Sequence, residues 1–331
     1  MKLNEIHEKL FDVVMNHTIP EFKKGLRVEL EKHLTAHSGK VPNYVAPLET
    51  FYKWFGKGYK GDLPLWKSHM GHLHAYYFWQ FARAVLLLDF DLGNHIMNSE
   101  PPKKTPVEIL KRLPYWSQWI RTHYAIEYDH KDPSRSITLD FLGCFASYVN
   151  IENTTYLNLT APVYSSSGSK TFDSLEVAFV IQIPLDHDRD IDADGTFITT
   201  VIGIPDDQDE SEREATQLIA LKFSKQALNL ILFICSQEQN LVGHGAVQPS
   251  VKRKGKNYKI QAVQKSKIIH VGQEFAEAIK EYETKASESK PTLRKAHLRI
   301  GHFNYYWTGP RSGAQKLISV WIPPQVISGK E

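Results

Sequence analysis

The C-terminal part of the chain combines cationic and aromatic side chains at the spacing of a β-strand. Because alternate residues of a strand share a face, one face is predicted to carry His297, Arg299, Phe303, Tyr305 and Trp307. An arginine guanidinium offers a fork of donors and aromatic rings offer apolar walls, so such a face can stack on bases or hold an extended peptide. The candidate peptide- or RNA-binding residues are His297, Arg299, His302, Phe303, Tyr305, Trp307, Arg311 and Trp321. The alternative is a closing hairpin whose rings fill the core and whose cations cover its rim.

A second cluster is a run of cations without an acid, consisting of Lys252, Arg253, Lys254, Lys256, Lys259, Lys265 and Lys267. Such a cluster can neutralise the phosphates of RNA or of a ribosome. One alternative is a solvated loop that keeps an edge strand soluble. Another is pairing with the acidic segment 206–214 of the same chain. The candidate basic loop consists of Lys252, Arg253, Lys254, Lys256 and Lys259.

Three other groupings lead to no assignment. Asp190, Asp192 and Asp194 match the start of a calcium loop, but its twelfth position is Val201 instead of a bidentate Glu, so we interpret the segment as an acidic turn. His69, His72 and His74 share a predicted helix with many aromatic residues and lack HExxH spacing, which favours packing or surface roles. The serine-rich segment 165–169 fits no nucleophile or phosphate-loop pattern. We therefore predict no catalytic residue, no metal and no cofactor, and favour a binding protein over an enzyme.

These clusters must be positioned by the elements that hydrophobic periodicity predicts. The N-terminal part of the chain is predicted to be helical. The predicted helices cover 3–15, 21–37, about 65–96 and 105–111, with a glycine-rich loop over 56–64. From Trp116 onward the period changes towards two, which predicts strands over 117–128, 137–149, 154–160, 175–183 and 196–203. A long apolar helix follows to about residue 238, then a Lys-rich loop, a helix over 272–285 and closing strands over 297–307 and 315–322.

The predicted fold class is α+β, with a helical N-terminal region packed on a mainly antiparallel sheet, a long buried helix and a C-terminal β-hairpin. We expect two parts: residues 1–113 form the helical region, and residues 114–331 form the sheet domain with the aromatic and basic hairpin. A chain of 331 residues with 42% hydrophobic and 23% charged residues is long enough to bury a sizeable core.

Composition also limits the partners and the compartment. The net charge of +3 does not by itself indicate nucleic acid. Both cysteines, Cys144 and Cys235, lie in apolar runs, which is typical of a reducing cytoplasm, and the N-terminus has no continuous apolar signal core. The most apolar stretch, 218–235, contains Lys222 and Lys225, so we expect a buried core helix and no membrane partner.

Three sequence patterns together resemble a family of phage and plasmid proteins that includes a type V-A anti-CRISPR inhibitor. The most distinctive pattern comprises His297, Arg299, Gly301, His302, Phe303, Trp321 and Pro323. The second comprises Ile109, Leu110, Leu113, Pro114 and Trp116. The third is Val271-Gly272, followed by a helix that ends near Tyr282. The three patterns cover about a third of the chain, and the middle, 130–240, is similar only in its strand-then-helix layout.

This resemblance implies an inhibitor that recognises the N-terminal part of a type V-A effector nuclease while it is being translated and causes its message to be lost. The partners would be the nascent effector polypeptide and, through the basic loop, the ribosome or mRNA in the cytoplasm of a bacterial host. Such a mechanism needs a groove or sheet edge for an extended peptide and a surface that stays close to RNA. One alternative from the residues is an RNA-binding or ribonuclease-like protein in which His297 or His302 acts as acid or base beside Arg299. The other is an interaction protein with a different target.

Overall fold

In the computed structural model, the residues described are 20–40, 44–58, 74–128, 137–165, 177–186, 190–192, 198–202, 210–237, 241, 250–261, 263, 265–288, 297–299, 301–310 and 313–327. The helices are α2 (Pro20–Ala36), α3 (Leu48–Gly58), a helix over 74–82, α5 (Phe90–Met97), α6 (Val107–Leu110), α7 (Glu210–Ser236) and α9 (Gln273–Glu288). The strands of the main sheet are β1 (Ala84–Leu88), β3 (Ser117–Tyr128), β4 (Ile137–Ile151), β5 (Thr154–Ser165), β6 (Val177–Pro184), β8 (Ile198–Ile202) and β11 (Lys267–Val271). The smaller pairs use β2 (Lys104–Thr105), β7 (Ile191–Asp192), β9 (Ser250–Lys254), β10 (Asn257–Gln261), β12 (His297–Arg299), β13 (His302–Thr308), β14 (Lys316–Ile322) and β15 (Gln325–Ile327).

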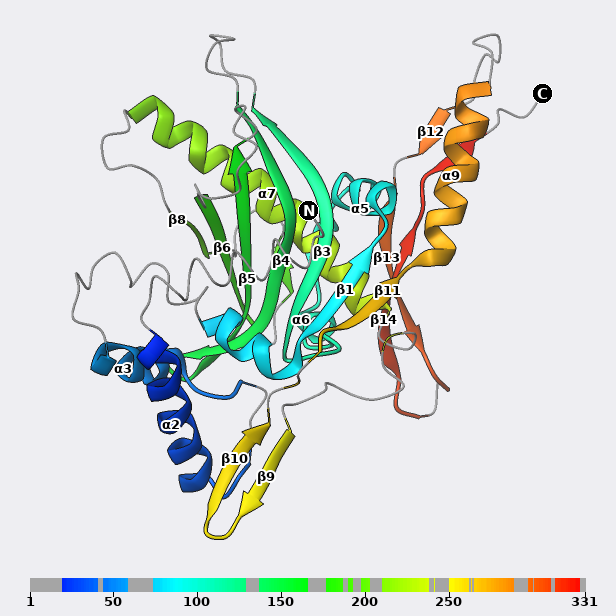
Figure 1. The fold of residues 1–331 in the computed structure, drawn as a ribbon. Coiled ribbons are helices and arrows are strands. Elements are labelled where there is room, and N and C mark those ends of the chain that lie inside the picture. The colour runs from blue at the N-terminus through cyan, green and yellow to red at the C-terminus, as the bar shows by residue number, and fades with distance from the viewer. Residues whose placement is uncertain are drawn as a thin grey trace.

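The main sheet has seven strands in the order β11-β1-β3-β4-β5-β6-β8 (Figure 1). Strand β1 pairs in parallel with β11 and β3, and the pairs from β3 to β8 are all antiparallel. Long runs of β-branched and aromatic residues at period two account for the central strands, which fall where the sequence predicts them. The predicted α+β class is confirmed, and so are its mainly antiparallel sheet, buried helix and C-terminal hairpin.

A bulge in β4, near the centre of the sheet, changes which face of the sheet its side chains point to. The register shifts between Phe141 and Phe145, and Gly143 has φ +140° with space for no side chain, since a Cβ there would lie 2.3 Å from the carbonyl oxygen of Ile120. As a result, the Phe141 ring packs on Phe223 of α7, whereas Phe145 packs on Tyr76 of the opposite layer. Both faces of the sheet are therefore covered.

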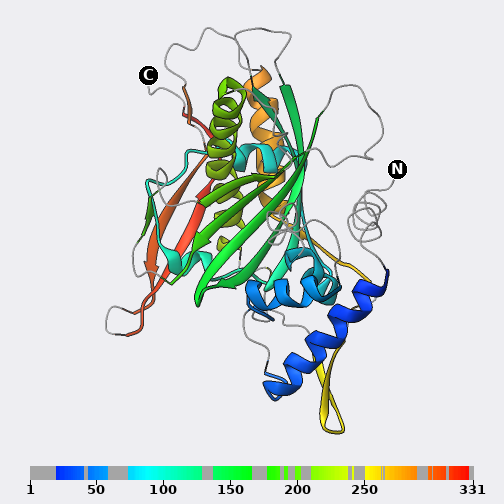
Figure 2. The same ribbon diagram turned by 90° about the vertical axis from the view of Figure 1, so that its left-hand side faces the viewer.

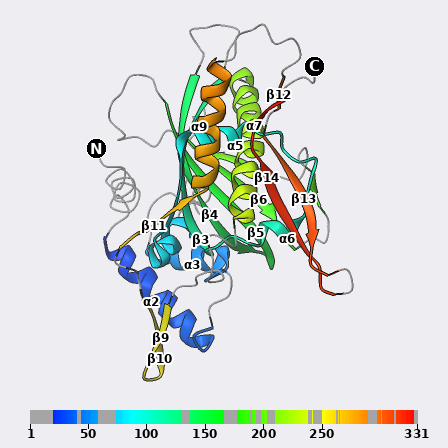
Figure 3. The ribbon, with the colours of Figure 1, turned by 90° about the vertical axis from the view of Figure 1, so that its right-hand side faces the viewer.

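Helix α7 lies between the sheet and the β13–β14 hairpin, as the side views show (Figures 2 and 3). A helix that is apolar all round needs partners on every side, and α7 finds them in the sheet, α5, α6 and β14. Residues 217–236 are apolar and long enough to span a membrane, but 78% of that window is buried within the protein. The sequence prediction of a core helix is confirmed.

The helix predicted over 65–96 is wrong in its second half. Within the described residues, this region forms a helix over 74–82, strand β1 and helix α5. The run Ala84-Val-Leu-Leu-Leu88 is buried on both sides, and a continuous apolar run of that length has no period that separates strand from helix. Helix α3, in a region where no helix was predicted before the glycine-rich loop, packs its Phe51 against the 74–82 helix.

Two further segments differ from the predictions. The Lys-rich loop is a β-hairpin, β9–β10, followed by the edge strand β11. The first closing strand is two strands, because β12 pairs with β15 whereas β13 pairs with β14. The division at residue 114 stays a prediction. Several predicted features lie outside the described residues: the helix 3–15, residues 206–209 of the acidic segment 206–214, and Asp194, His69 and His72.

Candidate functional site

Two aromatic side chains fix the base of the β13–β14 hairpin to the core. Phe303 and Trp321 stand opposite each other in the register, and they are only 7% and 2% exposed. The Trp321 ring packs edge-on between Phe233 of α7 and Phe275 of α9, at 5.5 Å from each ring centroid. Both residues were candidates for ligand contact. In the structure they anchor the hairpin and offer little surface to a partner.

Ser99, which follows α5, joins this anchor to the rest of the chain. Its hydroxyl accepts a hydrogen bond from Trp321 Nε1 at 3.0 Å and donates one to the carbonyl oxygen of His95 at 2.7 Å. Asn229 of α7 donates to the Ser99 carbonyl oxygen at 2.7 Å. Gly301 lies against the same group, since a Cβ there would be 2.9 Å from Ser99 Oγ and 3.1 Å from the Trp321 ring. The distinctive C-terminal motif thus holds the hairpin in place.

The other two motifs also have structural roles. The hydroxyl of Tyr148 accepts from the Leu113 amide at 3.0 Å and donates to the Leu110 carbonyl oxygen at 2.9 Å, which fixes the turn after α6. Gly272 has φ +73°, and a Cβ there would lie 2.8 Å from the side chains of Leu92 and Phe233. Only glycine fits both that backbone conformation and that space.

Half-way along the hairpin, Tyr305 connects β13 to β2. Its hydroxyl lies 3.3 Å from Oγ1 of the buried Thr105. Burial raises the pKa of Tyr305 to about 12, so the phenol stays protonated at neutral pH. Because Tyr305 is half-buried, only part of its ring is exposed to a partner.

The aromatic character of the hairpin reaches solvent only towards its free end. Trp307 is 66% exposed and Tyr306 is 46% exposed. Tyr306 lies on the opposite face from Trp307, where it pairs with Ile318 and accepts a hydrogen bond from Asn304 at 3.2 Å. Val320, 36% exposed, continues this outer face. Tyr306 and Val320 are not among the residues predicted from the sequence, although the alternation of a strand places them on the face opposite the predicted one.

The remaining predicted residues of this surface that the structure describes lie on strands of two different pairs. His302 is half-buried at the start of β13, where its backbone also bridges to Glu100. His297 and Arg299 lie on a separate pair, where they stand opposite Ile327 and Gln325. Arg311 lies outside the described residues. Among the described residues, no group of three or more His, Cys, Asp or Glu side chains could hold a metal ion.

The five predicted residues of the basic loop are brought together on β9–β10, and all five are exposed. The inner face of this hairpin packs on α2 through Ile260, which is 1% exposed. Arg27 of α2 donates to the Ile260 carbonyl oxygen at 3.3 Å, and the Tyr258 amide donates to Thr35 Oγ1 at 3.1 Å. The cations are thus carried on an ordered hairpin fixed to a helix.

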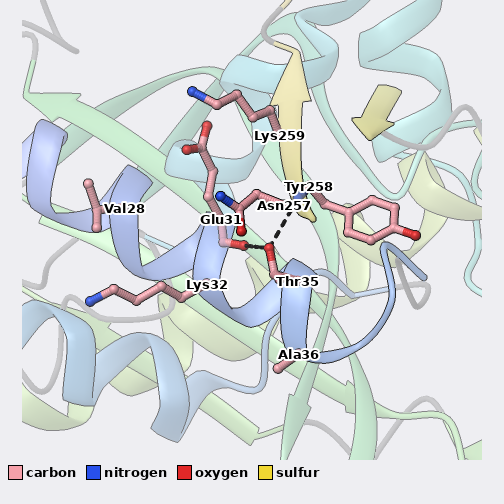
Figure 4. Close-up of a pocket in the computed structure, with 8 residues that line it drawn as sticks. All are labelled: Val28, Glu31, Lys32, Thr35, Ala36, Asn257, Tyr258 and Lys259. Atoms are coloured by element: carbon pink, nitrogen blue, oxygen red, sulfur yellow. Dashed lines mark hydrogen bonds between the residues drawn. The ribbon is translucent and has the colours of Figure 1, made fainter. Parts of the chain in front are cut away.

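A groove of about 490 Å³ lies between α2 and β10 (Figure 4). It is lined by Val28, Glu31, Lys32, Thr35, Ala36, Asn257, Tyr258 and Lys259. The Tyr258 ring points away from Val28 and Lys32, and it packs over Gly39, where a Cβ would lie 2.3 Å from the ring. Gly39 follows the end of α2 with φ +73°, and its lack of a side chain makes room for that ring.

Comparison with known proteins agrees with the family resemblance drawn from the sequence patterns. A family model described as "AcrVA2-like: Anti-CRISPR type V subtype A2 family" matches residues 87–329. Among solved structures, one described as "Crystal structure of AcrVA2" is similar with a TM-score of 0.53 and 13% sequence identity, over 98% of this chain and 97% of that chain. No curated protein matches this chain. At 13% identity the structural likeness concerns the fold alone.

Proposed function

Because the chain belongs to the AcrVA2-like anti-CRISPR type V subtype A2 family, we propose that it binds the nascent N-terminal peptide of a type V-A CRISPR effector and lowers the effector's message and protein level. The action takes place in the cytoplasm of the bacterial host, where the effector is translated. The protein acts by binding, and its partners are the nascent chain and the translation machinery that carries it.

The observation that supports peptide recognition is the contrast between the two ends of the β13–β14 hairpin. The base is fixed by Trp321, while Tyr306 and Trp307 are exposed near the free end. Rigid aromatic side chains give a large contact area at a small cost in conformational entropy, which suits recognition of an extended peptide. Tyr306 and Trp307 lie on opposite faces of the hairpin, so we expect the peptide to contact one of these two rings near the free end, and a double variant removes both.

A reporter experiment separates peptide recognition from RNA recognition. The effector's N-terminal segment is fused to a reporter in three forms: the native form, a synonymously recoded form with the same peptide, and a frameshifted form with nearly the same RNA. Coexpression of this protein should lower the reporter mRNA at least several-fold for the first two forms and leave the third unchanged. Loss of message from the frameshifted form would contradict peptide recognition.

Variants test the proposed surface in the same assay. Trp307→Ala combined with Tyr306→Ala should abolish the loss of message without changing the melting temperature by more than about 2 °C, because exposed substitutions cost little stability. Phe90→Ala is the matched control, since Phe90 is an aromatic residue that is 50% exposed on α5. Equal loss of activity in the control, or full activity in the double variant, would exclude this surface.

The second candidate function is RNA binding with ribonuclease-like chemistry, and the exposed cations of β9–β10 are the observation that favours RNA as a partner. The test is RNA cleavage by the purified protein in the absence of ribosomes. Robust cleavage that is abolished by His297→Ala would replace the binding-only proposal.

A further inference from the structure

The outer face of the β9–β10 hairpin carries a compact set of lysines. In the register, Lys252 stands directly opposite Lys259, and Lys254 stands opposite Asn257. Because residues two apart on a strand share a face, all three lysines lie on the same face, opposite the one that carries Ile260. None of the three forms an ion pair within the described part of the chain, and the strand residues 250–261 include no acid. The three charges are therefore held side by side in solvent.

This arrangement costs folding free energy. Side chains directly opposite on an antiparallel pair have Cβ atoms about 5 Å apart, and like charges there destabilise the pair. Lys259 borders the α2–β10 groove together with Glu31 (Figure 4), but Glu31 is paired with Arg27 at 3.3 Å and Glu29 with Lys32 at 2.7 Å, so these two acids offset the excess only in part.

We infer that the outer face of β9–β10 is a binding surface for the phosphate backbone of RNA. Contact between several closely spaced cations and a polyanion releases condensed counterions, and it turns the repulsion among Lys252, Lys254 and Lys259 into binding free energy. Lys256 extends the same charge to the turn of the hairpin, where it is exposed, whereas Arg253 stands opposite Tyr258 on the inner face.

The residues also indicate how the RNA is recognised. Lysine ammonium groups act as point charges on phosphate and lack the planar fork that reads a base edge. The aromatic ring of this hairpin, Tyr258, is packed over Gly39 on the inner face and cannot stack on a base from the outer one. Binding is therefore independent of sequence.

RNA binding by this outer face adds to the proposed function, and the biological role of the face rests on that proposed function. The tips of β9–β10 and β13–β14 point towards the same end of the molecule in all three views (Figures 1, 2 and 3). A protein that holds a nascent peptide on one hairpin can thus contact nearby RNA with the other. The direct binding test below needs no effector, so its failure is distinct from failure of peptide recognition.

The test measures binding of the full chain to fluorescent single-stranded 20-mer RNAs of two unrelated sequences over a salt series. For single strands, log K falls with log salt by about 0.7 per phosphate neutralised. The triple variant Lys252→Ala, Lys254→Ala, Lys259→Ala should weaken binding at least tenfold for both RNAs and reduce the magnitude of the slope by about 2. The matched control removes the same charge with Lys103→Ala, Lys104→Ala, Lys111→Ala and should bind as the original chain does.

Three results would overturn the inference: no binding by the original chain at low salt, equal weakening in the control, or tighter binding of polyglutamate than of RNA of the same charge. The last result would identify the surface as a site for acidic protein. If the triple variant no longer binds RNA but still causes peptide-dependent loss of message, the two surfaces act separately. That result would confirm RNA contact as an additional property.

Discussion

Protonation of one buried histidine should control the acid stability of the protein. The His74 side chain is fully buried; its Nε2 lies 2.9 Å from the carbonyl oxygen of Ala46, and its ring packs edge-on against Phe51 and Phe78. Burial lowers its pKa from 6.5 to about 4, and the hydrogen bond with Ala46 opposes that shift only in part. The neutral imidazole is therefore the form that the fold accommodates.

The magnitude follows from the two pKa values. The unfolded chain takes up the proton first as the pH falls, so the free energy of unfolding is unaffected well above pH 6.5 and decreases between pH 6.5 and about 4. The loss from His74 is about 2 kcal/mol at pH 5 and about 3 kcal/mol once the folded form is also protonated. Below that range both states carry the proton, and this residue adds no further pH dependence.

The assay is urea unfolding at pH 7 and pH 5 for the original chain and for His74→Gln, whose amide keeps a donor near Ala46 without titrating. The other titratable groups are common to both chains, so the original chain should lose about 2 kcal/mol more than the variant between the two pH values. In the original chain, the NMR signals of the His74 ring should not titrate above pH 5. A ring that titrates near pH 6.5, or equal losses in the two chains, would refute the reasoning.

Three further substitutions test the structural anchors by urea unfolding. Trp321→Phe should cost about 1 to 3 kcal/mol, because the Ser99 hydroxyl loses its donor and the core loses volume. Ser99→Ala should then cost less in this background than in the original chain, because only the hydrogen bond from Ser99 to His95 is left to lose. Equal costs of Ser99→Ala in the two backgrounds would show the two groups to be uncoupled. Gly301→Ala should destabilise by about 1 to 3 kcal/mol, because its Cβ would lie 2.9 Å from Ser99 Oγ; an unchanged stability would show that the contact relaxes freely. Tyr148→Phe should cost about 1 to 3 kcal/mol by leaving the buried Leu113 amide without its acceptor, whereas a neutral effect would contradict that hydrogen bond.

The C-terminal motif shows why a distinctive sequence pattern need not be a contact surface. Gly301, Phe303 and Trp321 resemble a family signature, and in the structure they form the packed joint that attaches the hairpin to α7 and α9. The exposed residues that we propose for peptide contact, Tyr306 and Trp307, are adjacent to this joint. A rigid joint is what lets exposed rings be held in one position for recognition.

Elements with a strong internal period can be predicted from the order of the amino acids alone. The strands β3 to β6 follow from β-branched and aromatic residues at period two, and α7 follows from an apolar run too long for a strand. The family resemblance could also be drawn from short motifs, since it depends on residue identity at fixed spacing and needs no knowledge of contacts.

Which side chains are available to partners depends on long-range packing, which the order of the amino acids does not reveal. The sequence placed Phe303, Tyr305 and Trp307 on one face of a strand, but their exposure rises along the hairpin because α7 and α9 cover its base and nothing in the described part of the chain covers Trp307. The sequence predicts a loop for the Lys-rich segment because its apolar residues are few. Its hairpin is fixed by Ile260 and Tyr258, which pack on α2, more than 200 residues earlier in the chain. Burial depends on what packs against each face, and that partner is set by contacts between segments far apart in the chain.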